Sequence, residues 1–244
     1  MRHLIVDVGN TLYKASIFEA SDQQVAIETT TWQSVIDFAQ KYAPQRGIVS
    51  SVREKNTPLI QSLDSLLSYP LLWLDYTTSL PITNAYDTPH TLGMDRLAGV
   101  VGAKTLYPEN NCLVIDAGTC ITYDFIDATG VYQGGSIAPG IRMRLEAMHT
   151  FTANLPLPDW NPQTSRPSLV SKSTEQALIS GAANGTIAEA EQIIATFQEQ
   201  YASTQVLVCG GDRNFFESTI KHPIFAVRNL VSIGLNRILE HNVF

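Results

Sequence analysis

Two segments that lie about half the chain apart share one pattern, which is an apolar run, an aspartate, a glycine and a small polar residue. They are Leu4-Ile5-Val6-Asp7-Val8-Gly9-Asn10-Thr11 and Leu113-Val114-Ile115-Asp116-Ala117-Gly118-Thr119. Apolar residues continue to alternate after each glycine, which is typical of a strand, a tight turn and a second strand. The repeat predicts two similar halves, each opening with an acidic β-hairpin. A chance likeness of two short strand-turn segments is the alternative.

Each predicted half mixes short buried strands with helices. A third apolar run, residues 206–208, ends at a Gly-Gly pair, and short runs bounded by turn residues are typical of buried strands. Apolar residues at helical spacing and helix-start signals predict helices over the segments 35–42, 95–104, 142 onwards, 174–201 and 230–241. The pattern favours α/β architecture, with one domain over residues 1–110 and a second over residues 111–244.

The predicted helix over 174–201 has two distinctive features. Ser173 precedes it as an N-cap, and Gln176 follows at capping-box spacing. Gly181 and Gly185 lie in its first half, where each costs about 1 kcal/mol relative to alanine. Such glycines are expected where another backbone packs closely against the helix.

Residues 154–168 form the longest predicted loop. The prolines at positions 156, 158, 162 and 167 exclude a continuous helix or a central strand. The segment is either an inert surface connection or a lid beside a binding site.

The composition argues against several classes of function. The chain has 244 residues, with 23 Asp+Glu against 16 Lys+Arg and a net charge of -7, which disfavours a general nucleic-acid-binding protein. No apolar stretch approaches the roughly 20 residues of a membrane span, and Asp7 interrupts the apolar run that a signal peptide would need. Three cysteines without a CxxC pair predict buried thiols. We therefore expect a cytoplasmic protein with neither a nucleic-acid nor a membrane partner.

The first hairpin turn has the residues of a phosphate-binding loop. Gly9 lets the backbone approach a ligand, Asn10 and Thr11 offer small polar donors, and Lys14 adds a positive charge. Asp7 repels a polyphosphate unless a cation lies between them, so phosphate binding here implies Mg²⁺, held by Asp7 directly or through water. A plain hairpin turn with an Asx hydrogen bond is the alternative.

Other glycine-rich segments extend this pattern. Residues 134–140 precede the helix expected near residue 141, whose N-terminus suits an anion or a nucleotide sugar. Gly210-Gly211-Asp212 follows the third strand and is a candidate neighbour of the base or ribose. Neither GxxxxGK[ST] nor a strand followed by GxGxxG is present, which disfavours P-loop and dinucleotide-binding folds.

Short motifs run through almost the whole chain in a fixed order. After the first hairpin come Gly93-Met94-Asp95-Arg96, the second hairpin with Thr122-Tyr123-Asp124, the loop from Gly134 to Gly140, Leu155-Pro156, Lys172-Ser173-Thr174 with Gly181 and Gly185, and Gly210-Gly211. This ordered set resembles the type III pantothenate kinases, within the superfamily of acetate kinase, sugar kinases, Hsp70 and actin. The resemblance implies two similar ribonuclease H-like (actin-like ATPase) domains with a central cleft. It also implies ATP-dependent phosphorylation of pantothenate to 4′-phosphopantothenate in coenzyme A biosynthesis.

The resemblance assigns roles for pantothenate. Asp95 is implied as the general base that takes the proton of the primary hydroxyl, and Arg96 as the ligand of the carboxylate. Tyr86 and Gly93 match other positions of the pantothenate pocket. Thr174 matches a residue that reaches the pocket from the partner subunit, so a homodimer with a shared active site is implied.

The resemblance also assigns roles for ATP and cations. The implied ATP-binding residues are Asp7, Gly9, Asn10, Thr11, Lys14 and Thr119, with Asp7 also holding Mg²⁺. Asp116 matches a position linked to a monovalent cation, K⁺ or NH₄⁺. Two other functions stay open, which are a catalytically silent nucleotide-binding regulatory relative and a kinase of the same fold that acts on a sugar or carboxylate. The presence of Asp7, Asp95, Arg96 and Asp116 favours an active kinase over the silent relative. The short chain without large insertions and the segment Gly93-Met94-Asp95-Arg96 favour pantothenate over a sugar or carboxylate.

Overall fold

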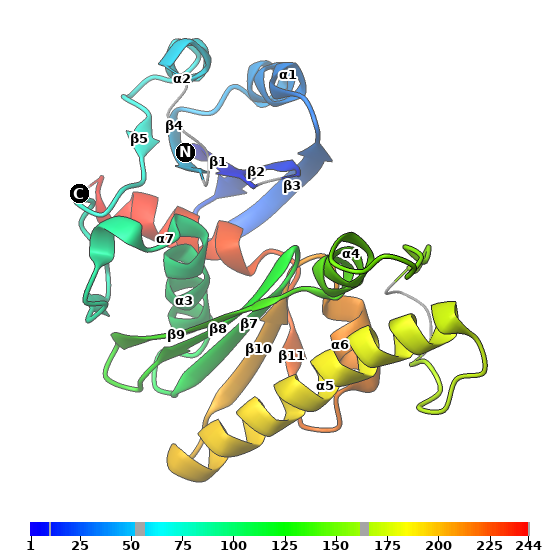
Figure 1. Ribbon diagram of the computed structural model, residues 1–244. Helices are drawn as coiled ribbons and strands as arrows, with labels where there is room; N and C mark the ends of the chain where they lie inside the picture. The colour runs from blue at the N-terminus through cyan, green and yellow to red at the C-terminus, as the bar shows by residue number, and fades with distance from the viewer. Residues whose placement is uncertain (10, 52–56, 162–165, 244) are drawn as a thin grey trace. The chain divides into compact units, whose positions relative to one another are not determined.

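The computed structural model describes residues 1–9, 11–51, 57–161 and 166–243 of the chain. It divides into two compact units. The first contains residues 1–108, 130–132 and 229–244, and the second contains residues 109–129 and 133–228. Figure 1 labels most of the helices and strands. Each unit is built on its own β-sheet.

The sheet of the first unit has the strand order β3-β2-β1-β4-β5. Its strands are β1 (Arg2–Val8), β2 (Tyr13–Glu19), β3 (Asp22–Thr29), β4 (Arg46–Ser51) and β5 (Leu72–Trp73). The first three form an antiparallel meander, whereas β4 and β5 run parallel to β1. The first predicted hairpin is confirmed, because β1 and β2 pair from Arg2↔Glu19 to Val8↔Tyr13.

Helices cover both faces of this sheet. They are α1 (Trp32–Tyr42), α2 (Thr57–Asp64), α3 (Met94–Leu106) and α7 (Leu230–His241). Leu4 and Val6 point to one face and pack in a cluster with residues of α1, whereas Ile5 points to the other and packs with residues of α3 and α7. This alternation follows from the two-residue period of a strand, and because both faces are covered, β1 is buried at every position except Arg2.

Two glycines let α3 and α7 cross at close range. A Cβ atom at Gly234 would lie 1.8 Å from the carbonyl oxygen of Ala98, and one at Gly102 would lie 2.3 Å from that of Leu230. Figure 1 shows the two helices side by side. Helix α7 therefore belongs to the first unit. The predicted division differs, because it assigned residues 111–244 to one domain.

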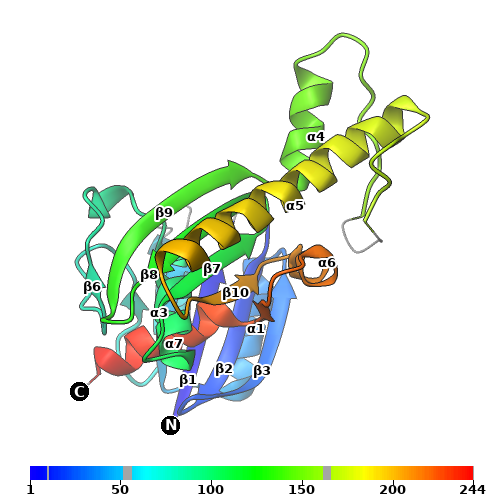
Figure 2. The ribbon, with the colours of Figure 1, turned by 90° about the horizontal axis from the view of Figure 1, so that it is seen from below.

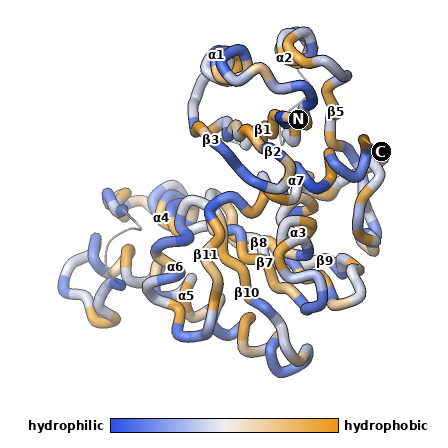
Figure 3. Tube along the Cα trace, turned by 180° about the vertical axis from the view of Figure 1, so that it is seen from behind, coloured by the Kyte–Doolittle hydropathy of each residue, from blue (hydrophilic) through white to orange (hydrophobic). Residues whose placement is uncertain are grey.

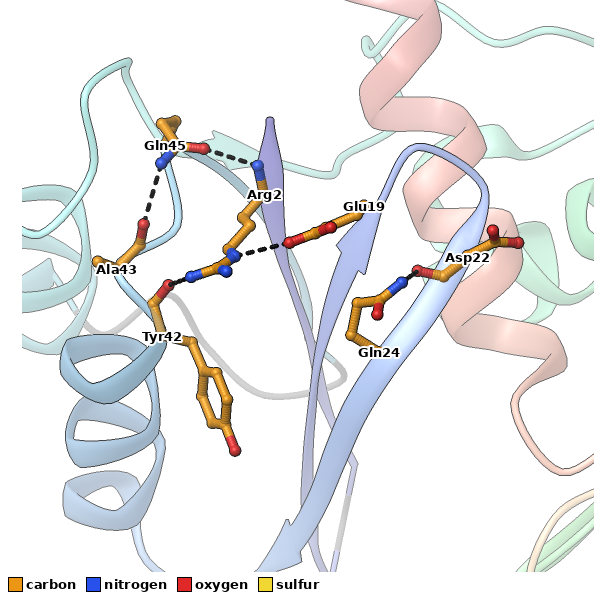
Figure 4. A network of polar contacts seen from close by, with 7 residues as sticks. All are labelled: Arg2, Glu19, Asp22, Gln24, Tyr42, Ala43 and Gln45. Carbon is orange, nitrogen blue, oxygen red and sulfur yellow. Dashed lines mark hydrogen bonds and ion pairs between the residues drawn. The ribbon is translucent and has the colours of Figure 1, made fainter.

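A polar network fixes the outer end of β1. The Arg2 guanidinium donates hydrogen bonds to Glu19 Oε1, at 2.8 Å, and to the carbonyl of Tyr42, at 3.1 Å (Figure 4). The Arg2 backbone N–H donates to Gln45 Oε1. The network joins β1, β2 and the end of α1 at the edge away from the Asp7 turn, so its role is structural.

The second sheet repeats the topology of the first. Its order is β11-β10-β7-β8-β9-β6, from β6 (Thr83–Asn84), β7 (Cys112–Ala117), β8 (Cys120–Ile126), β9 (Val131–Pro139), β10 (Gln205–Cys209) and β11 (Phe225–Ala226). The run β9-β8-β7-β10-β11 matches β3-β2-β1-β4-β5, with an antiparallel hairpin followed by two parallel strands. The second hairpin and the two similar α/β halves are therefore confirmed. Strand β6 pairs with residues 131–132 of β9, and these residues belong to the first unit.

Three helices complete the second unit, which are α4 (Ile141–Thr150), α5 (Thr174–Gln200) and α6 (Arg213–Thr219). Leu113 and Ile115 of β7 pack in one cluster with buried residues of all three helices. Figure 2 shows α5 running along the sheet, and Figure 3 shows hydrophobic residues along β7 and β10. The predicted capping box is confirmed in its first part, since the Ser173 side chain accepts a hydrogen bond from the Gln176 N–H.

No backbone of the described chain packs against Gly181 or Gly185. A Cβ atom at either position would meet nothing within 4 Å among the residues that the structure describes, and both glycines are exposed. The buried face of α5 is formed instead by residues such as Ala183, Ile187 and Ala190.

The remaining expectations concern loops, cysteines and membrane segments. Residues 154–161 and 166–168 contain neither helix nor strand, as the prolines predict, and residues 162–165 lie outside the description. Cys112 and Cys209 are buried and Cys120 is half-buried, and all three are free thiols. Among the described helices, none is both long enough and apolar enough to cross a membrane.

Candidate functional site

The turn between β1 and β2 brings Asp7 and Lys14 together in the first unit. They are direct cross-strand partners, and the Gly9 N–H donates to the Leu12 carbonyl at 3.0 Å to close the turn. Asp7 is only 9% exposed, whereas Thr11 is exposed. Cross-strand partners share one face of the sheet, so the carboxylate and the ammonium lie on the same side. The predicted ligand Asn10 lies outside the described residues.

A buried hydroxyl lies beside Asp7. Ser50 of β4 is the parallel register partner of Asp7 and is fully buried. Its Oγ has no hydrogen-bond partner among the described residues. A buried polar atom without a partner costs stability, so this hydroxyl suits a water or a ligand next to the carboxylate. Carboxylate and hydroxyl oxygens are the donors that a hard cation such as Mg²⁺ prefers.

The N-terminus of α3 holds Gly93, Asp95 and Arg96. Asp95 Oδ1 accepts a hydrogen bond from the Arg96 backbone N–H at 2.8 Å. A Cβ atom at Gly93 would lie 2.5 Å from Asp95 Oδ1, so a side chain there would displace the carboxylate. The local geometry thus explains the glycine at position 93, which leaves room for the Asp95 carboxylate.

Arg96 lies beside a pair of parallel aromatic rings. Its guanidinium carbon is 5.6 Å from the centre of the Tyr86 ring, and the side chain is mostly buried. The Tyr86 ring is stacked with the Tyr132 ring, with centres 6.1 Å apart and 4° between the planes. The structure thereby brings together Tyr86 and Arg96, which sequence reasoning assigned to one substrate.

Tyr132 is a residue that sequence reasoning missed. It lies in β9, is fully buried, and accepts a hydrogen bond at its carbonyl from the Ala85 N–H at 3.0 Å. The Asn84 side chain also accepts a hydrogen bond from the Tyr86 N–H. These contacts fix the position of Tyr86, and through it the aromatic surface beside Arg96. Nothing in the local sequence around Tyr132 distinguishes it from an ordinary buried tyrosine.

Three loops meet in the second unit at the β7–β8 hairpin. The Gly140 N–H donates to the Thr119 carbonyl at 3.0 Å, and the Asp212 N–H donates to the Ala117 carbonyl at 2.9 Å. Gly210 has φ = 90°, and a Cβ atom there would lie 2.5 Å from Asp116 Oδ1. Sequence reasoning selected these three loops separately, and the fold brings them into direct contact.

Asp116 has a buried hydroxyl beside it, as Asp7 has. Thr122 is its cross-strand partner, and Thr122 Oγ1 is buried without a hydrogen-bond partner among the described residues. The oxygen donors of these two side chains suit a hard cation. No group of three or more His, Cys, Asp or Glu side chains arranged to hold a metal ion occurs among the described residues. A cation here would therefore need further ligands from a substrate or water.

A pocket of about 290 Å³ lies in the second unit, next to these loops. Its wall is mostly apolar and is formed by Ile141, Leu145, Leu157, Pro158 and Trp160. Arg142, Asn161 and Asp212 supply its polar groups. The pocket is thus lined by the start of α4, the described part of the proline-rich loop and Asp212 of the Gly210-Gly211-Asp212 turn.

An ion pair fixes the start of α4 next to the pocket. Arg144 Nη2 lies 2.7 Å from Glu189 Oε2 of α5, and Arg144 Nε donates to the Pro139 carbonyl at 2.8 Å. The Tyr123 hydroxyl donates to the other oxygen of Glu189 at 3.1 Å. Burial and the Glu189 charge raise the pKa of Tyr123, so its proton stays in this hydrogen bond. Sequence reasoning placed Tyr123 in the second hairpin but identified neither Arg144 nor Glu189 as its neighbours, because the three residues lie far apart in the chain.

Asp212 differs from the other carboxylates of this unit. It precedes α6 at the N-cap position, yet its side chain makes no capping hydrogen bond to the described residues of that helix. Burial raises the pKa of its carboxyl to about 6 from an ordinary value of 3.8. The neighbouring Arg213 donates a hydrogen bond from Nη1 to the Gly210 carbonyl at 3.2 Å.

Thr174, which sequence reasoning assigned to the pantothenate pocket of a partner subunit, is the first residue of α5 and is exposed.

Solved structures identify the fold. A Baf family protein from Campylobacter jejuni is 22% identical, with a TM-score of 0.62 over 98% of both chains. The activator of 2-hydroxyisocaproyl-CoA dehydratase from Clostridium difficile is 11% identical, with a TM-score of 0.55 over 98% of this chain and 94% of that one. At these identities the similarity concerns the fold alone, and it confirms the expected actin-like ATPase architecture.

Sequence relatives identify the family. A type III pantothenate kinase of Bacteroides fragilis is 41% identical over 242 residues, which cover 98% of each chain. One of Cytophaga hutchinsonii is 39% identical over 99% of this chain and all of its own. The family model of type III pantothenate kinase matches residues 3–196, which include both acidic hairpins and the Gly93–Arg96 segment. The chain therefore belongs to the type III pantothenate kinase family.

Proposed function

We propose that the protein transfers the γ-phosphate of ATP to the primary hydroxyl of pantothenate, giving 4′-phosphopantothenate for coenzyme A biosynthesis. The observation that carries the proposal is the arrangement at the start of α3, where Asp95, a mostly buried Arg96 and the Tyr86 ring lie together. Membership of the family supports the same reaction. A cytoplasmic location, where ATP is available, is part of the proposal.

In this reaction Asp95 acts as the general base. Its carboxylate accepts the proton of the pantothenate hydroxyl as the oxygen attacks the γ-phosphorus, and ADP leaves. An aspartate in this role orients the nucleophile, and phosphoryl transfer depends chiefly on such positioning and on charge neutralisation. The hydrogen bond from the Arg96 N–H to Oδ1 holds the carboxylate in one orientation.

Arg96 binds the carboxylate of pantothenate. A guanidinium pairs with a carboxylate through two parallel hydrogen bonds, which fixes both distance and angle. Tyr86 forms one wall of the same pocket and is held by its stacking on Tyr132. Gly93 leaves room for the Asp95 carboxylate.

The two hairpins bind the phosphates of ATP. The residues assigned to them are Asp7, Gly9, Asn10, Thr11, Lys14 and Thr119. Mg²⁺ would be held by Asp7 and the phosphate oxygens, directly or through water, and supplies charge neutralisation. K⁺ or NH₄⁺ would be held at Asp116, where the orphan Thr122 hydroxyl offers a second oxygen.

We also propose a homodimer that uses the open face of α5. Gly181 and Gly185 are exposed and have no neighbour that a side chain would meet among the described residues. Leu169 and Val170, just before this helix, are 77% and 80% exposed. Exposed apolar residues next to an uncovered glycine face favour contact with a second copy of the chain. Thr174, the first residue of α5, would then reach the partner's pantothenate pocket.

A coupled assay of ADP formation tests the reaction. Pantothenate should trigger ADP release that requires Mg²⁺ and that is faster in K⁺ than in Na⁺ buffer. Absence of pantothenate-dependent ADP release would contradict the proposal. Equal rates in K⁺ and Na⁺ would contradict only the cation site at Asp116. No observation favours the catalytically silent relative or a sugar kinase.

A further inference from the structure

One peptide group connects the ion pair between α4 and α5 to the second hairpin. We propose that Arg144 and Glu189 are positioning residues for phosphoryl transfer, because together they fix the turn that carries Thr119. They act through the peptide group between Pro139 and Gly140. The proposal rests on the binding of the ATP phosphates at Thr119, as proposed above, and adds which residues hold that turn in place.

The peptide group between Pro139 and Gly140 is held at both of its polar atoms. Arg144 Nε donates to the Pro139 carbonyl oxygen at 2.8 Å. The Gly140 N–H donates to the Thr119 carbonyl oxygen at 3.0 Å. A trans peptide group is planar, so its C=O and N–H bonds point in opposite directions. The direction of the Pro139 carbonyl therefore sets the direction of the Gly140 N–H, and Arg144 thereby fixes the bond to Thr119.

The turn of the second hairpin lies directly against this peptide group. A Cβ atom at Gly140 would collide with the carbonyl oxygens of Gly118 and Thr119, so the two backbones are in contact. The Gly118 N–H donates to the Cys120 carbonyl at 3.0 Å to close the turn, and the Thr119 side chain is exposed. A rotation of the peptide group would therefore displace the exposed residue that is assigned to the phosphates.

Glu189 holds Arg144 in the orientation that this contact needs. Glu189 Oε2 lies 2.7 Å from Arg144 Nη2, and Glu189 Oε1 accepts a hydrogen bond from the Tyr123 hydroxyl at 3.1 Å. The side chains of the ion pair are only 22% and 32% exposed, so solvent screens their attraction less than that of an exposed pair. The planar guanidinium donates to the carboxylate and to the Pro139 carbonyl at a fixed mutual angle. A lysine at position 144 would keep the charge without this geometry.

A double-mutant cycle with Thr119 tests the proposal. The dissociation constant of ATP is measured by calorimetry, with Mg²⁺ and without pantothenate, for the wild type, Arg144→Met, Thr119→Ala and the double variant. Arg144→Met alone should weaken ATP binding by about tenfold. In the Thr119→Ala protein the same change should cost about twofold or less, because the contact that Arg144 positions is already lost. An equal loss in both backgrounds overturns the proposal.

Three further variants separate position from charge. Arg144→Lys should bind ATP about as weakly as Arg144→Met, and recovery of wild-type affinity by lysine overturns the positioning role. Glu189→Ala should also lose about tenfold, and an unchanged affinity overturns the role of Glu189. Glu191→Ala is the matched control, since Glu191 is also on α5 and accepts a hydrogen bond from the Lys221 N–H. It should bind ATP as tightly as the wild type, and an equal loss there would show a general effect of α5 and overturn the proposal.

Hydrogen exchange tests the structural link without a nucleotide. The Gly140 amide should exchange about tenfold faster in Arg144→Met than in the wild type, relative to the Leu207 amide of β10, which reports on global unfolding. Unchanged relative exchange overturns the link through the peptide group. Faster exchange with unchanged ATP affinity overturns the positioning role.

The outcomes also separate this inference from the proposed function. If pantothenate is not phosphorylated but the cycle shows coupling between positions 144 and 119, the inference stands and the proposed reaction fails. If the reaction occurs but the cycle is additive, the proposed function stands and the inference fails. Absence of ATP binding to the wild type overturns both.

Discussion

At the scale of single residues, the buried charge of Asp212 lowers the stability of the folded protein. A carboxylate in a mostly apolar pocket loses solvation, which disfavours its charged form and raises its pKa from 3.8 to about 6. Asparagine has nearly the same shape without the charge, so it would avoid this cost. Perturbed carboxyls of this kind concentrate at functional sites.

This conflict predicts a pH-dependent effect of Asp212→Asn on stability. The folded state holds the proton more tightly than the unfolded state, so wild-type stability falls as the pH rises from about 4 to about 6, and stays reduced above that. The Asp212→Asn variant has no carboxyl group at this position, so its stability does not fall in this pH range for this reason. After allowance for partial exposure of the side chain, the stabilisation by Asp212→Asn should grow by about 1 kcal/mol between pH 4.5 and pH 8. Urea unfolding of both proteins at the two pH values measures it, and a pH-independent difference would contradict the expected burial of the charge.

The sequence predicted some of the site residues and missed others for a physical reason. Asp7 and Lys14 were predictable as neighbours because a tight turn pairs them across a hairpin, and Asp95 and Arg96 are adjacent in the chain. Tyr132 and Trp160 were not predictable. Each contributes through a partner distant in sequence, and alone each is indistinguishable from a core aromatic residue.

At the scale of elements, the contact between α3 and α7 depends on two glycines. The predicted bounds of both helices were close to the observed ones, because apolar periodicity and local signals define a helix. The contact between them was not predictable, since helix pairing depends on packing between segments far apart in the chain. The same limit applies to Gly181 and Gly185, against which no described residue of the chain packs. Two glycines four residues apart show that one face of a helix lacks side chains, but they do not show which segment packs against that face.

The crossing predicts that Gly234→Ala is strongly destabilising. The added Cβ would lie 1.8 Å from the Ala98 carbonyl oxygen, so the helices must move apart. We expect a loss of about 2–4 kcal/mol of unfolding free energy, although alanine favours a helix by about 1 kcal/mol over glycine. Chemical denaturation measures it. Arg237→Ala, on the exposed side of the same helix, should change stability by less than about 0.5 kcal/mol. Equal effects of the two substitutions would refute the close crossing.

At the scale of the whole molecule, the chain repeats one sheet topology twice. The repeat was predictable from two short segments, because each encodes a strand, a turn and a strand, and such hairpins are local. The final helix α7 was not predictable as part of the first unit. It follows the second half in sequence, and only its packing on α3 assigns it. The predicted central cleft between the halves stays a prediction.

The proposed dimer gives a prediction for the assembled molecule. Wild-type protein should sediment at twice the 26.8 kDa chain mass. Gly185→Leu should give a folded monomer, because leucine favours a helix and meets no neighbour within the described chain, but blocks a second helix. Gln200→Leu, exposed at the end of α5, is the control and should stay dimeric. A wild-type monomer with full activity would exclude the shared active site.

The central claim is that Asp95 acts as the base in phosphorylation of pantothenate. The most direct measurement is turnover of Asp95→Asn in the coupled assay, with ATP affinity measured in parallel and Asp37→Asn, an exposed carboxylate of α1, as control. We predict that turnover falls by roughly 10²–10⁴-fold while ATP binding is retained and the control is unaffected. Turnover of Asp95→Asn close to that of the wild type would contradict the account.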